Sequence, residues 1–226
     1  MRQPLENDEI YHIYNRGVEK RDIFSDPYDV ARFLESMREF NTRDPIGSLY
    51  QNSFKRRNGQ LSGETAKLEK LVEIIAYCLN PNHFHLILRQ VSDRGVSEFM
   101  KRVSGGYTWY FNYKNDRSGA LFQGTFKSKH IPTNTYLLHV SAYVNLNNEV
   151  HKLPKNDLLF VGNRRSSWVE YTQRGKKKKE ADICIKESVL GQFKNYKEYE
   201  RFAMNSLQGI VEKKKLQKEI GSLLLE

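Results

Sequence analysis

Two histidines separated by one residue, His83 and His85, open an apolar run in this chain. In a β-strand, side chains at positions i and i+2 lie on the same face, so both imidazoles project together while Phe84 and Leu86 project to the other face. Two imidazoles side by side on one strand can chelate a divalent metal ion. The alternative for so short a motif is a pair of surface histidines on a half-exposed strand.

The pattern around the histidines predicts a β-hairpin. Residues 71–79 are rich in Val, Ile and Tyr and predict a buried strand, residues 80–82 (Asn-Pro-Asn) predict a turn, and residues 83–89 form the returning strand. Another strand is predicted over residues 9–16. Arg16 at its end is either a phosphate contact or a solvated turn arginine.

Three segments have apolar residues at helical spacing and predict helices that position this sheet. Asp26 and Asn134 are the expected N-caps of the first and third helices, and the second helix begins near Val96. A strand over residues 121–131 carries Lys127 and Lys129 on one face, where they are candidate DNA contacts. Tyr107 opens an aromatic run in which most rings are expected in the core and one or two can stack on bases, so Tyr107 is also kept as a candidate DNA contact.

Composition favours a polyanionic partner. The chain of 226 residues has a formal net charge of +10 and contains 13 Tyr and 12 Phe. Basic residues interleaved with aromatic residues suit single-stranded nucleic acid, because phosphates pair with Lys and Arg while bases stack on rings. A basic protein with an aromatic core is the alternative. The two cysteines have neither disulfide-framework nor zinc-site spacing. With no apolar signal region and no membrane-length apolar stretch, we expect a cytoplasmic protein and no membrane contact.

The apolar residues lose their regular spacing in two parts of the chain. Residues 43–70 lose the helical pattern, contain Lys55-Arg56-Arg57, and predict a flexible insertion. After residue 151 the pattern weakens, a basic run spans residues 174–179, and two helical segments are expected over residues 188–205 and 206–225. We therefore expect a basic, mostly helical C-terminal extension.

Several short motifs in order resemble the single-tyrosine HUH transposases, most of all the branch of REP-associated tyrosine transposases. The matching stretches are Tyr11 to Gly17, Asn80 to His85, Tyr107 to Asn112, Gly119 to Ser128 and Tyr143 to Asn147. Thr125 and Asn148 depart from the family pattern, which commonly has arginine and proline there. The resemblance covers about residues 9–150 and extends weakly beyond.

The resemblance implies a fold and a domain organisation. The expected fold is an α+β, ferredoxin-like sandwich with a central antiparallel sheet, helices on one face and the active site on the other, followed by a helical C-terminal extension. Residues 1–150 would form the catalytic domain, and residues 151–226 the extension.

The resemblance also implies a catalytic site. His83 and His85 would bind Mg²⁺ or Mn²⁺, Asn147 matches the position of a third ligand, and Tyr143 matches the nucleophile. The tyrosine oxygen would attack a DNA phosphate, release a 3′-hydroxyl and form a 5′-phosphotyrosine bond. Because the pKa of free tyrosine is about 10, another group must accept its proton or stabilise its anion, and His139 and Lys127 are the candidates. His139 is also a candidate DNA contact.

The leading function is therefore a metal-dependent endonuclease and strand transferase for single-stranded or hairpin (REP-like) DNA. A self-mobilising insertion-sequence transposase uses the same chemistry and remains an alternative. A non-catalytic hairpin DNA-binding protein and a metal-dependent RNA-binding protein are two further alternatives. The motifs leave open whether the protein is a monomer or a homodimer, and whether the tyrosine acts in cis or in trans.

Overall fold

A four-stranded antiparallel sheet lies at the centre of the fold. The computed structural model describes residues 4–52, 69–150, 165–172 and 182–223. The strands follow the order β2-β3-β1-β4 across the sheet, and their bounds are β1 Ile10–Arg16, β2 Val72–Asn80, β3 His83–Gln90 and β4 Lys127–His130. A short 3₁₀ turn, η1, spans Val18–Lys20. The chain order β1-α1-β2-β3-α3-β4 confirms the predicted ferredoxin-like α+β fold.

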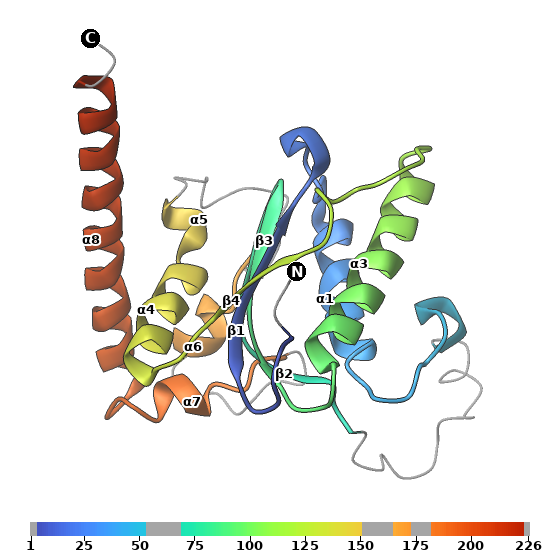
Figure 1. The fold of residues 1–226 in the computed structure, drawn as a ribbon, viewed down its shortest axis with the longest axis horizontal. Helices are drawn as coiled ribbons and strands as arrows, with labels where there is room; N and C mark the ends of the chain where they lie inside the picture. The colour runs from blue at the N-terminus through green and yellow to red at the C-terminus, as the bar shows by residue number, and fades with distance from the viewer. Residues whose placement is uncertain (1–3, 53–68, 151–164, 173–181, 224–226) are drawn as a thin grey trace.

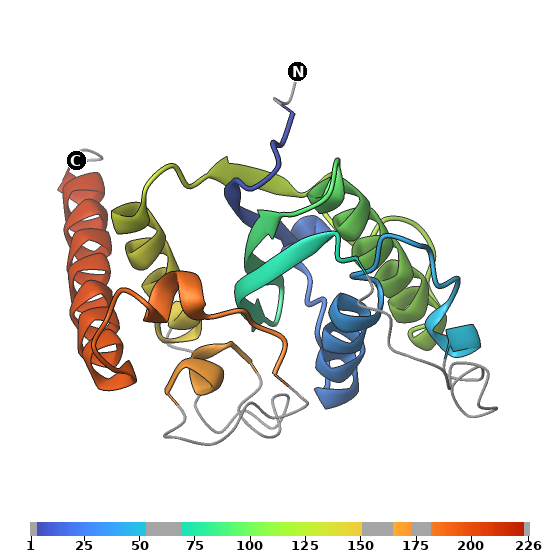
Figure 2. The ribbon, with the colours of Figure 1, turned by 90° about the horizontal axis from the view of Figure 1, so that it is seen from below.

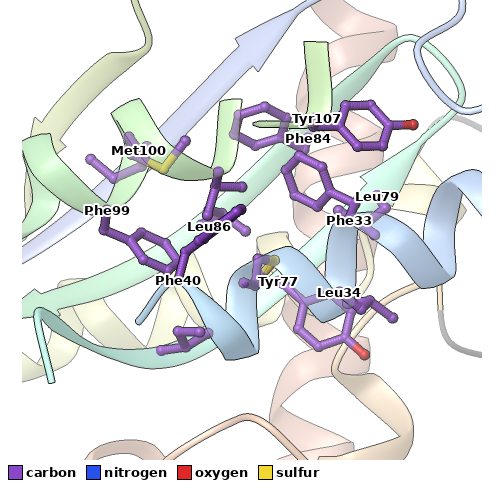
Figure 3. Close-up of a cluster of buried hydrophobic side chains, with 14 of the residues drawn as sticks. Phe33, Leu34, Phe40, Tyr77, Leu79, Phe84, Leu86, Phe99, Met100 and Tyr107 are labelled. Atoms are coloured by element: carbon purple, nitrogen blue, oxygen red, sulfur yellow. The ribbon is translucent and has the colours of Figure 1, made fainter. Parts of the chain in front are cut away.

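The crossover helices α1 (Pro27–Glu39) and α3 (Gly95–Lys114) cover one face of the sheet (Figure 1). As predicted, Asp26 caps α1, accepting hydrogen bonds from the backbone N–H groups of Tyr28 and Asp29 at 2.9 and 3.0 Å. Buried side chains between this face and the two helices form what we call the first core, part of which is shown in Figure 3. The first core packs α1 and α3 against β1, β2 and β3, and so fixes the positions of side chains on the opposite face of these strands.

That opposite face carries a second set of helices, separated by the sheet from α1 and α3 in both views (Figures 1 and 2). They are α4 (Asn134–Asn145), α5 (Asn147–Val150), α6 (Trp168–Thr172), α7 (Glu187–Leu190) and α8 (Tyr196–Leu223). Side chains from α4, α6, α7 and α8 bury a second core against the sheet. The face predicted for the active site is thus partly covered by α4 and by helices of the C-terminal extension.

The C-terminal extension is joined to the sheet by backbone hydrogen bonds. Leu79 N–H donates to the carbonyl of Arg165 at 2.7 Å, and Ser167 N–H donates to the carbonyl of Tyr77 at 2.9 Å. Residues 165–167 therefore protect the edge of β2, an edge that would otherwise expose unpaired backbone groups. The domain boundary at residue 150 stays a prediction.

Three local predictions are corrected by the structure. The strand expected over residues 121–131 is limited to Lys127–His130, because Gly124 turns the chain with a φ of 70° just before it. Thr133, rather than Asn134, caps α4 through its side chain. The two helical segments expected on either side of residue 205 are replaced by the short α7 and the continuous α8.

Some predicted features fall outside the described residues. They are residues 53–68 of the expected insertion, with its basic triplet, and the basic run at 174–179. Among the helices that are described, none is long and apolar enough to cross a membrane.

Candidate active site

The two histidines lie on the second face of the sheet, as their spacing predicts. In the β1–β3 register, His83 is paired with Arg16 and His85 with Tyr14. The two imidazole rings are nearly perpendicular, with centroids 5.2 Å apart. His85 is buried, with 8% of its surface exposed, and His83 is half-buried. Strand geometry therefore holds both rings beside each other at one end of the sheet.

Hydrogen bonds define which nitrogen of His83 carries the proton. Its Nδ1–H donates to Oδ1 of Asn82 at 2.7 Å, and its Nε2 accepts from Nδ2 of Asn80 at 3.0 Å. Nε2 therefore presents a lone pair, and it faces Oδ1 of Asn147 at 3.4 Å. Two acceptor atoms face each other at that distance, an arrangement that a shared positive group stabilises.

This donor set fits a divalent metal ion. Nδ2 of Asn80 donates to both acceptors, at 3.0 Å to His83 and 2.7 Å to Asn147, so a partly positive group already interacts with both lone pairs. Adjacent octahedral ligands with bonds of about 2.1 Å lie roughly 3 Å apart, close to the observed separation. Nδ2 of Asn147 is buried without a hydrogen-bond partner in the described part of the chain. Imidazole nitrogen and amide oxygen are ligands that suit Mn²⁺ or Mg²⁺.

The third predicted ligand in this set, Asn147, is an amide. The described residues contain no group of three or more His, Cys, Asp or Glu side chains placed to hold a metal. Asn147 begins α5, because α4 ends at Asn145. The break at Leu146 nevertheless leaves the Asn147 side chain buried against His83.

Tyr143 of α4 packs onto the same site. Its ring meets that of His85 edge to face, with centroids 5.5 Å apart, and that of His12 at 6.2 Å. Burial raises the pKa of Tyr143, and the neighbouring Asn147 side chain opposes part of that shift. The hydroxyl is therefore protonated at neutral pH, so its use as a nucleophile requires removal of the proton or stabilisation of the phenolate.

A cavity of about 310 Å³ opens beside these side chains. Its lining consists of His83, His85 and Tyr143 together with Tyr14, Asn15, Arg16, Gln123 and Lys127. Two of the predicted DNA contacts, Arg16 and Lys127, thus share one cavity with the predicted nucleophile and metal ligands. Two exposed cations beside a neutral donor set make the cavity suitable for an anionic group such as a phosphodiester.

The other three predicted DNA contacts lie elsewhere. Lys129 is exposed on β4, outside the cavity, with its ammonium 5.3 Å from the centre of the Tyr136 ring. His139 is exposed and turned to α8, where its Nδ1 lies 3.4 Å from Oγ of Ser206. This position does not support its predicted role as proton acceptor for Tyr143.

Tyr107 is a core residue. It has 0% of its surface exposed, and its hydroxyl donates to the carbonyl of Ile23 at 2.5 Å. It also belongs to the first core, on the face of the sheet away from the cavity. The prediction that Tyr107 contacts DNA is therefore corrected.

The sequence pattern did not single out several side chains of the site. Asn80 and Asn82 bond to His83, and His12 of β1 bonds to His85 with a distance of 2.9 Å between Nε2 and Nδ1. Burial, assisted by the charge of Lys129, lowers the pKa of His12 to about 4, so it is neutral at neutral pH. Alternation along β1 would have placed His12 and Tyr14 on one face, but only the pairing of β1 with β3 brings them to the histidine pair.

Comparison with known proteins identifies a family for the segment that contains this site. The model of the family described as IS200-like transposases matches residues 47–147. This segment is therefore similar to IS200-like transposases. None of the curated proteins matches the chain. A solved structure of a REP-associated tyrosine transposase bound to a REP hairpin is similar at 14% identity and a TM-score of 0.47, over 84% of this chain and 94% of that one.

The matched segment contains the predicted nucleophile and all three predicted metal ligands, from His83 to Asn147. His12 and Arg16 precede it in the chain and reach the site through β1. The predicted resemblance to single-tyrosine transposases is confirmed by this match. The net charge of +10 also favours a polyanionic partner such as DNA.

Proposed function

We propose that the protein is an endonuclease and strand transferase that cleaves and rejoins single-stranded or hairpin DNA through a 5′-phosphotyrosine bond on Tyr143. His83, His85 and Asn147 would hold Mg²⁺ or Mn²⁺. The observation that carries this proposal is the contact between the Tyr143 and His85 rings, 5.5 Å between centroids, at the wall of one cavity. Arg16 and Lys127 line the same cavity, and Oδ1 of Asn147 lies 3.4 Å from Nε2 of His83.

The chemical step follows from this arrangement. The hydroxyl oxygen of Tyr143 attacks the phosphorus of the scissile phosphodiester, and a Tyr143 O–P bond replaces the P–O3′ bond. Tyr143 loses its proton and the departing 3′ oxygen gains one, so a free 3′-hydroxyl and a protein-linked 5′-phosphate result. Because one phosphoester bond replaces another, a 3′-hydroxyl can later attack the phosphotyrosine and rejoin the strand without an external energy source.

Charge stabilisation is divided between the metal and two cations. A bound metal ion would polarise the phosphoryl oxygen and neutralise charge that develops on it. Arg16, at the end of β1 beside His83, can donate hydrogen bonds to a non-bridging oxygen. Lys127 lines the same cavity and can donate to the departing 3′ oxygen or stabilise the Tyr143 phenolate.

Unpaired DNA is the substrate class that suits this site. One nucleophile, Tyr143, and one set of metal ligands would serve a single scissile phosphate, which corresponds to cleavage of one strand. Unpaired bases leave the backbone free to bend into a cavity, whereas a paired strand must first be unpaired. The resemblance to REP-associated transposases suggests hairpins as the substrates. A short palindrome in single-stranded DNA folds into such a hairpin.

Incubation with labelled hairpins tests the proposal. Single-stranded and hairpin oligonucleotides, each in DNA and RNA form, are incubated with the full chain and Mn²⁺, and covalent adducts are scored on denaturing gels. The proposal predicts adducts with DNA, abolished by a chelator and by His83→Ala. Undiminished cleavage in excess chelator contradicts the metal site. Tight hairpin binding with no adduct under any metal supports the non-catalytic alternative, and preference for RNA supports an RNA-processing function.

A further inference from the structure

His12 lies beneath the proposed metal site and has no role in the chemistry described above. It is half-buried in β1, and its Nε2 lies 2.9 Å from Nδ1 of His85. The two rings are stacked, with centroids 5.0 Å apart and planes inclined by 25°. A stacked, bonded pair of imidazoles requires a defined proton arrangement, because one nitrogen must donate and the other must accept.

His83, the other histidine of β3, also has its Nδ1 bonded to a neighbouring side chain. Nδ1–H of His83 donates to Oδ1 of Asn82, and Nε2 of His83 faces Asn80 and Asn147. Both histidines of β3 therefore have Nδ1 engaged by a neighbouring side chain. A neutral imidazole has one N–H and one lone pair, so a donating Nδ1 leaves the lone pair on Nε2.

We propose that His12 is a positioning residue that accepts a hydrogen bond from Nδ1–H of His85 and thereby presents Nε2 of His85 to the metal ion. This inference rests on the proposed metal site. Partners of this kind set the tautomer and the ring orientation of histidine ligands and raise their basicity. His12 would act on His85 as Asn82 acts on His83.

The sheet makes this placement rigid. In the β1–β3 register Tyr14 is opposite His85, and His12 is opposite Ile87, so His12 lies diagonally adjacent to His85 on the same face. The Tyr143 ring packs against His12 and His85 alike, which limits rotation of both imidazoles. A flexible side chain at position 12 would have to pay an entropy cost to hold the same hydrogen bond.

Mn²⁺ affinity is the first test, measured by electron paramagnetic resonance titration of the full chain without DNA. His12→Phe keeps an aromatic ring but removes the acceptor, and we expect its affinity to fall about 10- to 100-fold. His12→Gln supplies an acceptor oxygen at a similar reach and should recover most of the affinity. His130→Phe, which removes an exposed histidine of β4 bonded to Glu9, should leave the affinity unchanged.

The tautomer of His85 is the second readout and needs no metal. In ¹⁵N-histidine-labelled wild-type protein, NMR should show His85 protonated at Nδ1, and His12→Phe should shift it toward a mixture of tautomers. A wild-type His85 protonated at Nε2, or equal Mn²⁺ affinity in wild type and His12→Phe, overturns the inference. If His85→Ala leaves Mn²⁺ binding intact, the proposed metal site itself is wrong, a failure that the His12 variants alone would not produce.

Discussion

The Tyr143 ring packs edge to face on the His85 ring of the same chain, with the two planes at 76°. The helix that carries Tyr143 is held by the second core, so this contact does not require a second protomer. The sequence left open whether the tyrosine acts in cis or in trans, and this contact favours action in cis. A nucleophile that reaches the metal ligands of its own chain should act in cis.

Mixing two inactive variants tests cis action. Tyr143→Phe lacks the nucleophile and His83→Ala lacks a metal ligand, so an enzyme that acts in cis should form no adduct from a mixture of the two. Adduct formation is measured after co-incubation, and also after joint unfolding and refolding to permit exchange of protomers. Recovery of activity in either mixture would show that the tyrosine of one chain works at the metal site of another.

A buried hydroxyl on α8 secures the helix that carries Tyr143. The Tyr199 hydroxyl accepts a hydrogen bond from Nδ2 of Asn145 at 2.8 Å and lies 3.2 Å from Oγ of Ser141. Tyr199→Phe leaves the buried amide of Asn145 without this partner, and we expect a loss of about 1–3 kcal/mol in the free energy of unfolding. Urea denaturation measures it, with Tyr113→Phe as the control because Tyr113 is 80% exposed. Equal losses in both variants would refute the structural role of Tyr199.

Acid should weaken the start of α1. Desolvation acts to raise the pKa of Asp26. The hydrogen bond from Lys114 at 2.5 Å, the charge of Lys114 and the backbone hydrogen bonds from Asp29 and Tyr28 together outweigh it, so the pKa lies below the ordinary value of 3.8. A depressed carboxyl pKa stabilises the fold above the unfolded value, and this contribution is lost as pH falls through the lower folded value.

The matched variant for this effect is Asp26→Asn, because asparagine caps a helix about as well as aspartate but does not titrate. We expect its free energy of unfolding to depend less steeply on pH below 3.8 than that of wild type. Denaturant titrations at several pH values measure both curves. Parallel curves would mean that the Asp26 carboxylate contributes nothing in this range.

Salt dependence should identify the cations that meet DNA. Arg16→Ala and Lys127→Ala each remove a charge at the cavity, so each should reduce the slope of log affinity against log salt by about 0.7–0.9. Lys101→Ala is the control, because Lys101 lies on α3 across the sheet with 79% of its side chain exposed. Tyr143→Phe should bind almost as wild type, since it removes no charge. A slope reduced equally by Lys101→Ala would place the DNA elsewhere.

Local signals were sufficient for the framework of the fold. Residues with high strand propensity predicted β1, the turn at residues 80–82 predicted the return of the chain as β3, and the apolar stripe and Asp26 predicted α1. The spacing of His83 and His85 predicted one shared face. These features depend on residues close in sequence, which is why a pattern can predict them. The length of β4 and the break between α4 and α5 depend instead on how the chain packs after Gly124 and Leu146.

The side chains that contact the two histidines could not be predicted from local sequence patterns. His12 and His85 are 73 residues apart, and their hydrogen bond exists only because β1 pairs with β3 in one register. Tyr107 shows the converse error, since an aromatic run in a basic chain suggests rings that stack on bases, whereas the Tyr107 ring is buried in the first core. Sequence patterns identified candidate residues, but long-range strand pairing determines which of these residues are in contact.

Mapping of the covalent adduct tests the central claim most directly. Protein trapped with a cleaved hairpin is digested, and mass spectrometry locates the tyrosine that carries the 5′-phosphate of the DNA. Tyr14 is the sharpest rival because it lines the same cavity, so Tyr14→Phe and Tyr143→Phe form the matched pair. The account predicts a modification on Tyr143, an adduct from Tyr14→Phe and none from Tyr143→Phe. An adduct that persists in Tyr143→Phe, or that maps to Tyr14, Tyr136 or Tyr107, would contradict it.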